Sequence, residues 1–236
     1  MPHDLARRLR AGTARSHRAA ERSALIRALL RGAADPVTYA ALVRGLLAVY
    51  TALEAALERR RDHPVVGALH LPALWRRGAL RRDLAYLTRE TCPEDHSSTP
   101  AVAAYVARIH ELESRAPELL VAHAYVRYLG DLAGGRILGA VIGRALGLAP
   151  GRGLDFYDFP AVADPAAAAA DFRRRLDDLP VDDATVERLV AEADRAFGHN
   201  LAVFAELEGS ALAGALRLAL GRGAPPRTAP PAPAPT

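Results

Sequence analysis

The stretch YLGDLAGGRILGAVIGRALG, which runs from Tyr128 to Gly147, decides how this sequence is interpreted. Its pattern is that of a helix, yet it contains Gly130, Gly134, Gly135, Gly139, Gly143 and Gly147. Each glycine inside a helix costs roughly 0.8–1 kcal/mol relative to alanine, so the segment gives up on the order of 5 kcal/mol. A folded chain needs a reason to place so many glycines here.

Two explanations fit these glycines. From Gly135 onward they recur at every fourth residue and form a stripe on one helix face, which is typical of close helix–helix packing. Gly130, Gly134 and Gly135 instead surround Asp131. Because glycine permits a kink and lets a ligand touch the backbone, a flat ligand pressed against a bent helix is the second explanation.

The composition favours an all-α fold. Half of the 236 residues are apolar and a quarter are charged, as in a soluble globular protein, and helix-forming Ala, Leu and Arg outnumber β-branched residues. Candidate N-caps followed by proline occur at Asp35, Thr99 and Asp164. We therefore predict a single multi-helical domain over residues 1–222, followed by a Pro/Ala-rich disordered tail over 223–236.

The spacing of apolar residues predicts six to eight helices. One is expected over residues 5–30, and the glycine segment is expected to begin at Pro117 and end before Pro150. Near the C-terminus we expect one helix over 182–207 and a separate helix over 210–220.

Charge and cysteine content exclude several classes of protein. All 31 basic residues are arginine, and they are dispersed along the sequence. The sequence contains no basic block interleaved with aromatic residues, so it gives no indication of a nucleic-acid partner. Cys92 is the only cysteine, which excludes a disulfide framework and a thiolate metal cluster. No run approaches the roughly 20 apolar residues of a membrane span, and no apolar signal segment opens the chain. We expect a cytoplasmic, soluble protein.

The histidines offer no familiar metal motif. The sequence has no Glu-x-x-His pair, His-Glu-x-x-His, P-loop or Gly-x-Ser-x-Gly elbow. His17 has Glu21 one helical turn later on the same face. This pair is either a surface contact or a single axial metal ligand with a carboxylate beside it, and the spacing does not choose between them.

Two segments carry a resemblance to a known family. AYVRYLGDLAGGRILG, at residues 124–139, closely resembles the distal-helix signature of the heme oxygenase family, and TARSHRAAE, at 13–21, is similar to its proximal-helix segment. VYTALEAALERRRDHPVV, LRRDLAYL, FYDFP and AFGHNLAVFAEL resemble the intervening and C-terminal parts of the family. The resemblance covers about residues 5–208.

The resemblance implies an all-α fold that holds heme between a proximal and a distal helix. It implies an oxidoreductase that uses O₂ and electrons from an external donor, a ferredoxin or flavoprotein reductase, to convert heme into biliverdin, ferrous iron and CO. Heme would be both substrate and cofactor. We expect a monomer with no nucleic-acid or membrane partner. The alternative is a non-catalytic relative that binds or transfers heme.

The resemblance also assigns residues to the iron and to the heme faces. It implies that His17 is the axial iron ligand and that Glu21 lies beside it. Gly130 and Gly134 would contact the distal heme face, where the absence of side chains leaves room for O₂. Asp131 would anchor a water network that delivers protons.

Further residues of the family match positions in this chain. Tyr125 and Arg127 match positions that support the proton network. Arg10, Arg173 and Arg175 match the cations that bind the heme propionates, a role that suits bidentate Arg–carboxylate pairing. Three residues depart from the family pattern: Ala133, where the motif usually has serine, Arg136, where glutamine is common, and Ala169, where many members have a second basic residue.

Overall fold

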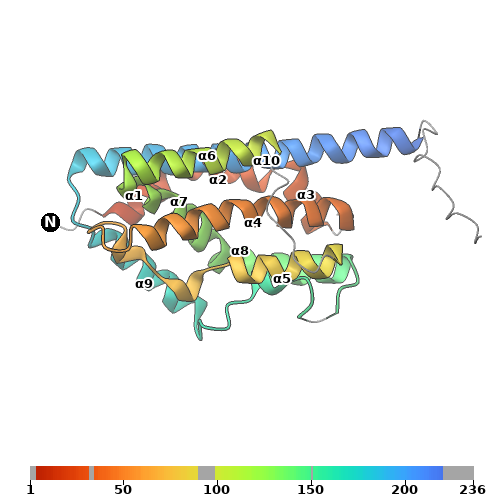
Figure 1. Ribbon diagram of the computed structural model, residues 1–236, viewed down its shortest axis with the longest axis horizontal. Helices are drawn as coiled ribbons and strands as arrows, with labels where there is room; N and C mark the ends of the chain where they lie inside the picture. The colour runs from red at the N-terminus through yellow and green to blue at the C-terminus, as the bar shows by residue number, and fades with distance from the viewer. Residues whose placement is uncertain (1–3, 32–34, 90–98, 150, 220–236) are drawn as a thin grey trace, which may run out of the picture.

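The computed structural model describes residues 4–31, 35–89, 99–149 and 151–219, and of 210–219 only the backbone. In these ranges every regular element is helical and no strand occurs, which confirms the all-α prediction. The α-helices are α1 Leu5–Gly12, α2 Ala14–Glu21, α3 Ala24–Leu30, α4 Pro36–Arg59, α5 Arg77–Thr88, α6 Pro100–Arg115, α7 Leu120–Ala124, α8 Gly130–Ala145, α9 Pro165–Asp177 and α10 Asp183–Ala219. Figure 1 shows their arrangement. The predicted boundary at 222 and the predicted tail lie outside the described residues.

Five short helical turns connect these helices. Four are 3₁₀ turns: η1 Gly67–Leu69, η2 Pro72–Leu74, η3 Pro117–Leu119 and η5 Asp155–Tyr157. The fifth, η4 Tyr125–Leu129, is a turn of π-helix directly before α8. The glycine segment is therefore not one regular helix from Pro117, as the spacing predicted, because a π-turn precedes Gly130. Such turns inside helices frequently mark functional sites.

The prediction of one N-terminal helix over residues 5–30 is wrong. The structure divides this stretch into α1, α2 and α3, and the described residues thus contain ten α-helices instead of six to eight. The hydroxyl of Thr13 donates to the Leu9 carbonyl at 2.7 Å where α1 ends. The side chain of Ser23 accepts the Ile26 N–H at 3.2 Å and caps α3. His17 consequently lies on a short helix of its own.

The C-terminal break predicted near residue 208 is also wrong, because α10 is continuous through Gly209. A single glycine costs a helix only about 1 kcal/mol, and no proline interrupts this stretch. One unbroken helix therefore runs along the bundle (Figure 1).

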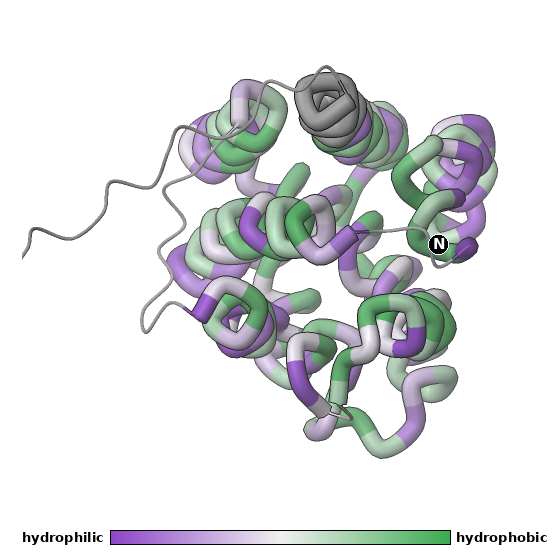
Figure 2. The backbone as a smooth tube through the Cα atoms, turned by 90° about the vertical axis from the view of Figure 1, so that its right-hand side faces the viewer, coloured by the Kyte–Doolittle hydropathy of each residue, from purple (hydrophilic) through white to green (hydrophobic). Residues whose placement is uncertain are grey.

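The central helix of the bundle is α4. Two residues favour its start. Asp35 accepts the N–H groups of Val37 and Thr38 at 2.9 Å, and Pro36 occupies the first helical position. Figure 2 shows α4 surrounded by the other helices. By length and composition alone α4 could cross a membrane, contrary to our sequence expectation, but 72 % of its apolar window is buried inside the bundle. It is the core helix of this fold.

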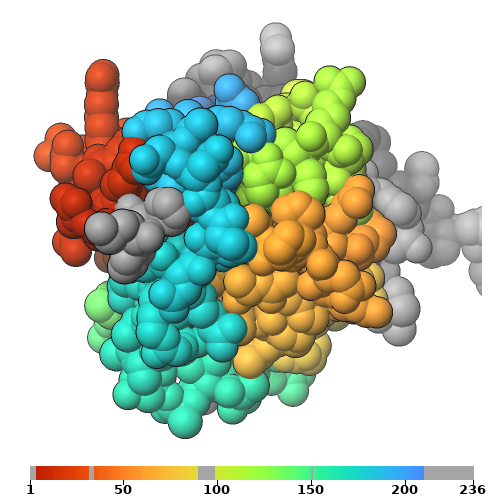
Figure 3. Space-filling model, turned by 90° about the vertical axis from the view of Figure 1, so that its left-hand side faces the viewer, coloured from red at the N-terminus to blue at the C-terminus, as the bar shows by residue number. Residues whose placement is uncertain are grey.

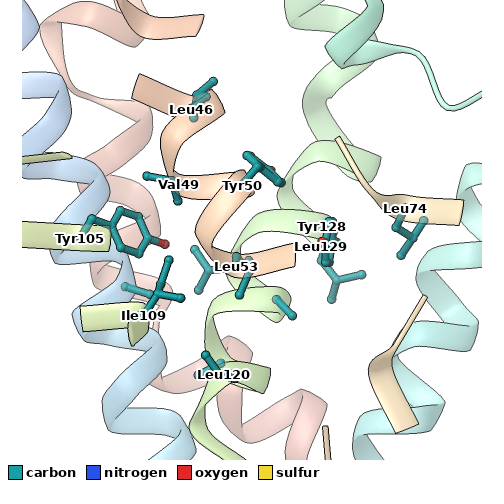
Figure 4. Packing of buried hydrophobic residues seen from close by; sticks show 14 of the residues in the cluster. Leu46, Val49, Tyr50, Leu53, Leu74, Tyr105, Ile109, Leu120, Tyr128 and Leu129 are labelled. Carbon is teal, nitrogen blue, oxygen red and sulfur yellow. The ribbon is translucent and has the colours of Figure 1, made fainter. Parts of the chain in front are cut away.

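The hydrophobic core forms where α4 meets α6 and α7. Leu53 of α4, Ile109 of α6 and Leu120 of α7 are fully buried there (Figure 4). At one end of the bundle α1 packs against α9 and the start of α10 (Figure 3). This contact brings the N-terminal helices, which carry His17, against the C-terminal half of the chain.

A buried polar cluster joins α6, α7 and α10. Glu192 is 3 % exposed and accepts hydrogen bonds from Nε and a terminal nitrogen of Arg108 at 3.0 and 2.6 Å. Nε2 of the fully buried His123 lies 3.0 Å from the same carboxylate. Burial opposes the charge of Glu192, but His123 and Arg108 lower its pKa to about 2. Burial also lowers the pKa of His123.

Candidate functional site

A largely apolar cavity of about 320 Å³ lies where α3, α4, α8, η5 and α10 meet. Ile26 of α3, Leu46 of α4 and Phe204 of α10 contribute apolar walls. The polar side chains among its lining are those of Arg127, Asp131 and Tyr157. An apolar cavity with a few converging polar groups is the usual form of a small-molecule site.

The glycines of α8 divide into two sets. A Cβ atom added at Gly130 or Gly134 would meet nothing within 4 Å, and both residues line the cavity. A Cβ atom at Gly139 would lie 2.9 Å from Tyr157, and one at Gly135 would lie 3.6 Å from it. The first set leaves bare backbone facing the cavity, and the second set lets η5 pack closely against α8. Both explanations considered for the glycines therefore apply, to different residues.

Asp131, in the first turn of α8, is a buried carboxylate at the edge of this bare backbone. Its side chain is 10 % exposed, it accepts a hydrogen bond from the hydroxyl of Tyr50, and its Oδ1 lies 3.9 Å from Arg127. Burial raises the pKa of Asp131, and Arg127, Tyr50 and Arg76 oppose the rise. Burial also raises the pKa of Tyr50 well above its ordinary value, so this phenol keeps its proton and remains a donor.

Arg127 connects Asp131 to two residues that the sequence did not reveal. Its Nε donates to the hydroxyl of Tyr50 at 3.1 Å, and a terminal nitrogen donates to Oδ1 of Asn200 at 2.6 Å. The spacing of apolar residues in α10 could have identified Asn200, because it occupies a buried position in line with Ala196. Tyr50 gives no such signal, since it lies within the apolar run of α4.

His17 is exposed on α2, and its Nδ1 lies 3.6 Å from a carboxylate oxygen of Glu21. The imidazole meets the ring of Phe197 edge-to-face at 5.7 Å. His17 is not among the residues that line the cavity, but Phe197 precedes the cavity-lining Phe204 by two turns of α10. The imidazole of His17 thus packs against α10, the helix that also contributes Phe204 to the cavity.

Tyr125 interacts with Thr13 and Arg10, both at the end of α1, and with Arg173 of α9. Burial raises the pKa of Tyr125, while a hydrogen bond with Thr13 and the charges of Arg173 and Arg10 oppose the rise. Both arginines are exposed and make no ion pair with any described residue. The sequence grouped Tyr125 with the proton network, whereas its hydroxyl lies within electrostatic range of two arginines that have no ion-pair partner among the described residues.

Arg175 has other partners. Its Nε donates to Asp171 at 2.7 Å and a terminal nitrogen donates to the carbonyl of Ala68 at 3.2 Å. Of the departures from the family pattern, Ala169 is buried in the core of α9, and Ala133 and Arg136 are exposed on α8. The structure therefore favours Arg173 over Arg175 as a cation available to a ligand.

These features define an all-α protein with a ligand cavity bounded partly by bare helix backbone. The family model described as heme oxygenase matches residues 3–206. The chain is 40 % identical over 210 residues to Heme oxygenase 1 of Nostoc sp., which covers 89 % of this chain and 88 % of the relative. The identity to Heme oxygenase 1 of Synechocystis sp. is also 40 %, with 89 % and 87 % covered.

Solved structures agree with this relationship. The crystal structure of heme oxygenase-1 from Synechocystis in complex with heme superimposes with a TM-score of 0.86 at 37 % identity, covering 93 % of this chain and 99 % of the other. Heme oxygenase from Leptospira interrogans gives a TM-score of 0.83 at 41 % identity, covering 87 % and 100 %. The chain belongs to the heme oxygenase family, which confirms the predicted enzyme class and single all-α domain.

Proposed function

We propose that this protein cleaves heme, with O₂ and electrons from an external donor, into biliverdin, ferrous iron and CO. The observation that carries the proposal is the buried Asp131 beside the bare backbone of Gly130 and Gly134. A flat ligand seated on this backbone lies next to a carboxyl group with a raised pKa. Binding alone does not require such a proton donor, so the arrangement favours catalysis over heme transfer.

The residues present fit heme. The open space above Gly130 and Gly134 accepts a planar ring, and the apolar walls of the cavity suit a porphyrin. Imidazole is a common axial ligand of heme iron, and the side chain of His17 is exposed, so a heme iron can reach it. Heme, when bound, supplies both the iron that activates O₂ and the ring that is oxidised.

We assign His17 as the axial ligand through Nε2. Nδ1 lies 3.6 Å from a carboxylate oxygen of Glu21, a separation longer than a hydrogen bond, so Glu21 favours a proton on Nδ1 by its charge and leaves Nε2 to bind the iron. A partner of this kind fixes the tautomer and orientation of a ligating imidazole. The edge contact with Phe197 restricts rotation of the ring further.

On the other face Asp131 holds and transfers a proton, and Tyr50 and Arg127 position it. A carboxyl group whose pKa is raised is a better proton donor than an ordinary one. Tyr50 and Arg127 hold the carboxylate in place, and Asn200 holds Arg127. We propose that Asp131 would hold protons and pass them, through water, toward the open space over Gly130 and Gly134 where a bound heme would activate O₂.

Arg10, Arg173 and Tyr125 bind the heme propionates in this proposal. The two guanidinium groups have no competing carboxylate among the described residues, and the Tyr125 hydroxyl lies near both. Charge-assisted hydrogen bonds from arginine to carboxylate are strong and directional. Such anchoring would orient a bound heme in the cavity and so influence which meso carbon is oxidised.

The remaining partners follow from the proposed chemistry. We propose that a ferredoxin or flavoprotein reductase supplies electrons to a monomeric, soluble enzyme in the cytoplasm, without nucleic acid or membrane. A formal net charge of +4, carried entirely by arginine, suits an acidic protein partner.

Turnover of heme tests the proposal against the non-catalytic alternative. Heme, O₂ and a reductant are added to the protein, and conversion of the heme absorption band to that of biliverdin is followed. Asp131→Ala is expected to bind heme with little change while biliverdin formation falls, with Asp131→Asn as the variant that keeps shape but loses the acid. His17→Ala is expected to alter the heme spectrum. Persistent, unchanged heme in the wild type contradicts the proposal.

A further inference from the structure

Asp83 is a fully buried carboxylate of α5 that takes no part in the chemistry above. Its Oδ1 accepts the N–H of Asp155 and its Oδ2 accepts the N–H of Phe156, both at 2.8 Å. The neighbouring Arg82, 63 % exposed, donates from Nε to the side chain of Asp155 at 2.6 Å. Helix α5 thus holds the turn η5 at two points, one buried and one at the surface.

The turn held in this way supplies two aromatic rings to the cavity. Phe156 and Tyr157 both line it. The ring of Phe156 packs edge-to-face on Tyr50 at 5.7 Å, and Tyr157 packs against Gly139 of α8. Because the hydroxyl of Tyr50 donates to Asp131, the position of η5 affects where that hydroxyl lies.

The hydrogen bonds explain why a carboxylate is present at this buried position. A buried carboxylate is unfavourable unless its oxygens are well paired. A helical turn of three residues cannot satisfy its own first N–H groups. Asparagine has nearly the same shape as aspartate but has one acceptor oxygen, and its NH₂ group cannot accept. Only the carboxylate of Asp83 satisfies both N–H groups at once.

We infer that Asp83 is a positioning residue for heme cleavage, acting through Phe156 on Tyr50 and thereby on Asp131. It touches neither the proposed ligand nor the proton-carrying groups. The inference rests on the proposed function, in which Tyr50 orients the carboxyl group of Asp131. It extends the site to a residue of α5, a helix that contributes no side chain to the lining of the cavity.

The test is Asp83→Asn, compared with Arg82→Gln as a control that removes only the exposed contact with Asp155. In Asp83→Asn the kcat for biliverdin formation is expected to fall on the order of tenfold, since small displacements of catalytic groups have effects of this size. The KM for heme is expected to stay within about twofold, because no propionate or axial contact changes. Arg82→Gln is expected to keep the wild-type kcat, because exposed ion pairs contribute little.

A double-variant cycle separates positioning from general destabilisation. If Asp83 acts through Tyr50, then Asp83→Asn should slow the Tyr50→Phe enzyme far less than it slows the wild type. Multiplicative effects of the two substitutions overturn the inference. A kcat for Asp83→Asn equal to that of the wild type, or one that falls only with the folded fraction measured by circular dichroism, also overturns it.

Measurements on the heme-free protein keep the inference independent of turnover. Asp83→Asn is expected to accelerate hydrogen exchange at the amides of Asp155 and Phe156 and to shift the NMR signals of the Tyr50 ring. Unchanged Tyr50 signals overturn the positioning role. A wild-type protein that makes no biliverdin contradicts the proposed function instead, and the Tyr50 signals still decide the inference.

Discussion

The two sets of glycines in α8 lead to opposite predictions for substitution by alanine. At Gly130 and Gly134 the new methyl group meets open space, so only the helix propensity changes, and the heme-free protein should gain roughly 0.8–1 kcal/mol of unfolding free energy. At Gly139 the methyl group would lie 2.9 Å from Tyr157. Overpacking of this kind costs about 1–3 kcal/mol, which exceeds or cancels the gain in propensity.

Heme affinity should follow the reverse order. The methyl groups at Gly130 and Gly134 enter the space that the proposal gives to heme and O₂, so Kd should rise on the order of tenfold, equivalent to about 1.4 kcal/mol. Gly209 of α10 also has open space around its missing Cβ and does not line the cavity. Gly209→Ala is therefore the control that gains stability without losing affinity.

Two measurements complete this test. Urea unfolding of the heme-free variants, followed by circular dichroism, gives the stability, and titration with heme, followed by absorbance, gives Kd. If Gly134→Ala binds heme and turns it over like Gly209→Ala, the assignment of bare backbone to the heme site is refuted. If Gly139→Ala is more stable than the wild type, the packing role is refuted.

Three further predictions follow from the contacts described. Arg173→Gln should raise the Kd for heme several-fold more than Arg175→Gln, measured by titration, because Arg175 is paired with Asp171 whereas Arg173 has no carboxylate partner among the described residues; equal effects contradict the assignment. Tyr50→Phe should slow biliverdin formation while the KM for heme stays nearly constant, because it removes the hydrogen bond to the distal carboxylate; a change confined to KM refutes this. For Glu192, a folded-state pKa lowered from 4.5 to about 2 contributes about 3 kcal/mol of stability above pH 4.5, which is lost as the pH falls toward 2. Urea unfolding should therefore show the wild type losing stability below pH 4.5 more steeply than Glu192→Gln, and parallel curves contradict this.

The sequence was most informative where a residue is costly in its local context. Glycines next to Asp131 are unfavourable in a helix, and this cost pointed to a ligand before any contact was known. The all-α fold followed from composition and from caps such as Asp35, which the structure shows in place. Helix ends marked only by weak signals, such as the break after Gly12, were missed.

Contacts between residues far apart in the sequence could not be predicted from spacing. Tyr50 lies within a buried apolar helix, and its role depends on a partner 81 residues away. The cluster of Tyr125 with Arg10 and Arg173 exists only because α1 packs beside α9. Asp83 resembles an ordinary surface residue of an amphipathic helix until the turn η5 is seen above it. Sequence spacing contains no information on such pairings.

The central claim is that heme bound at this site is cleaved, and product stoichiometry tests it most directly. Protein loaded with a single equivalent of heme is supplied with O₂ and a reductant under catalase, which removes free hydrogen peroxide, and both biliverdin and CO are quantified. The proposal predicts equimolar biliverdin and CO matching the heme consumed, and a sharp fall of both in Asp131→Ala. Heme that remains intact, or disappears without CO, would contradict it.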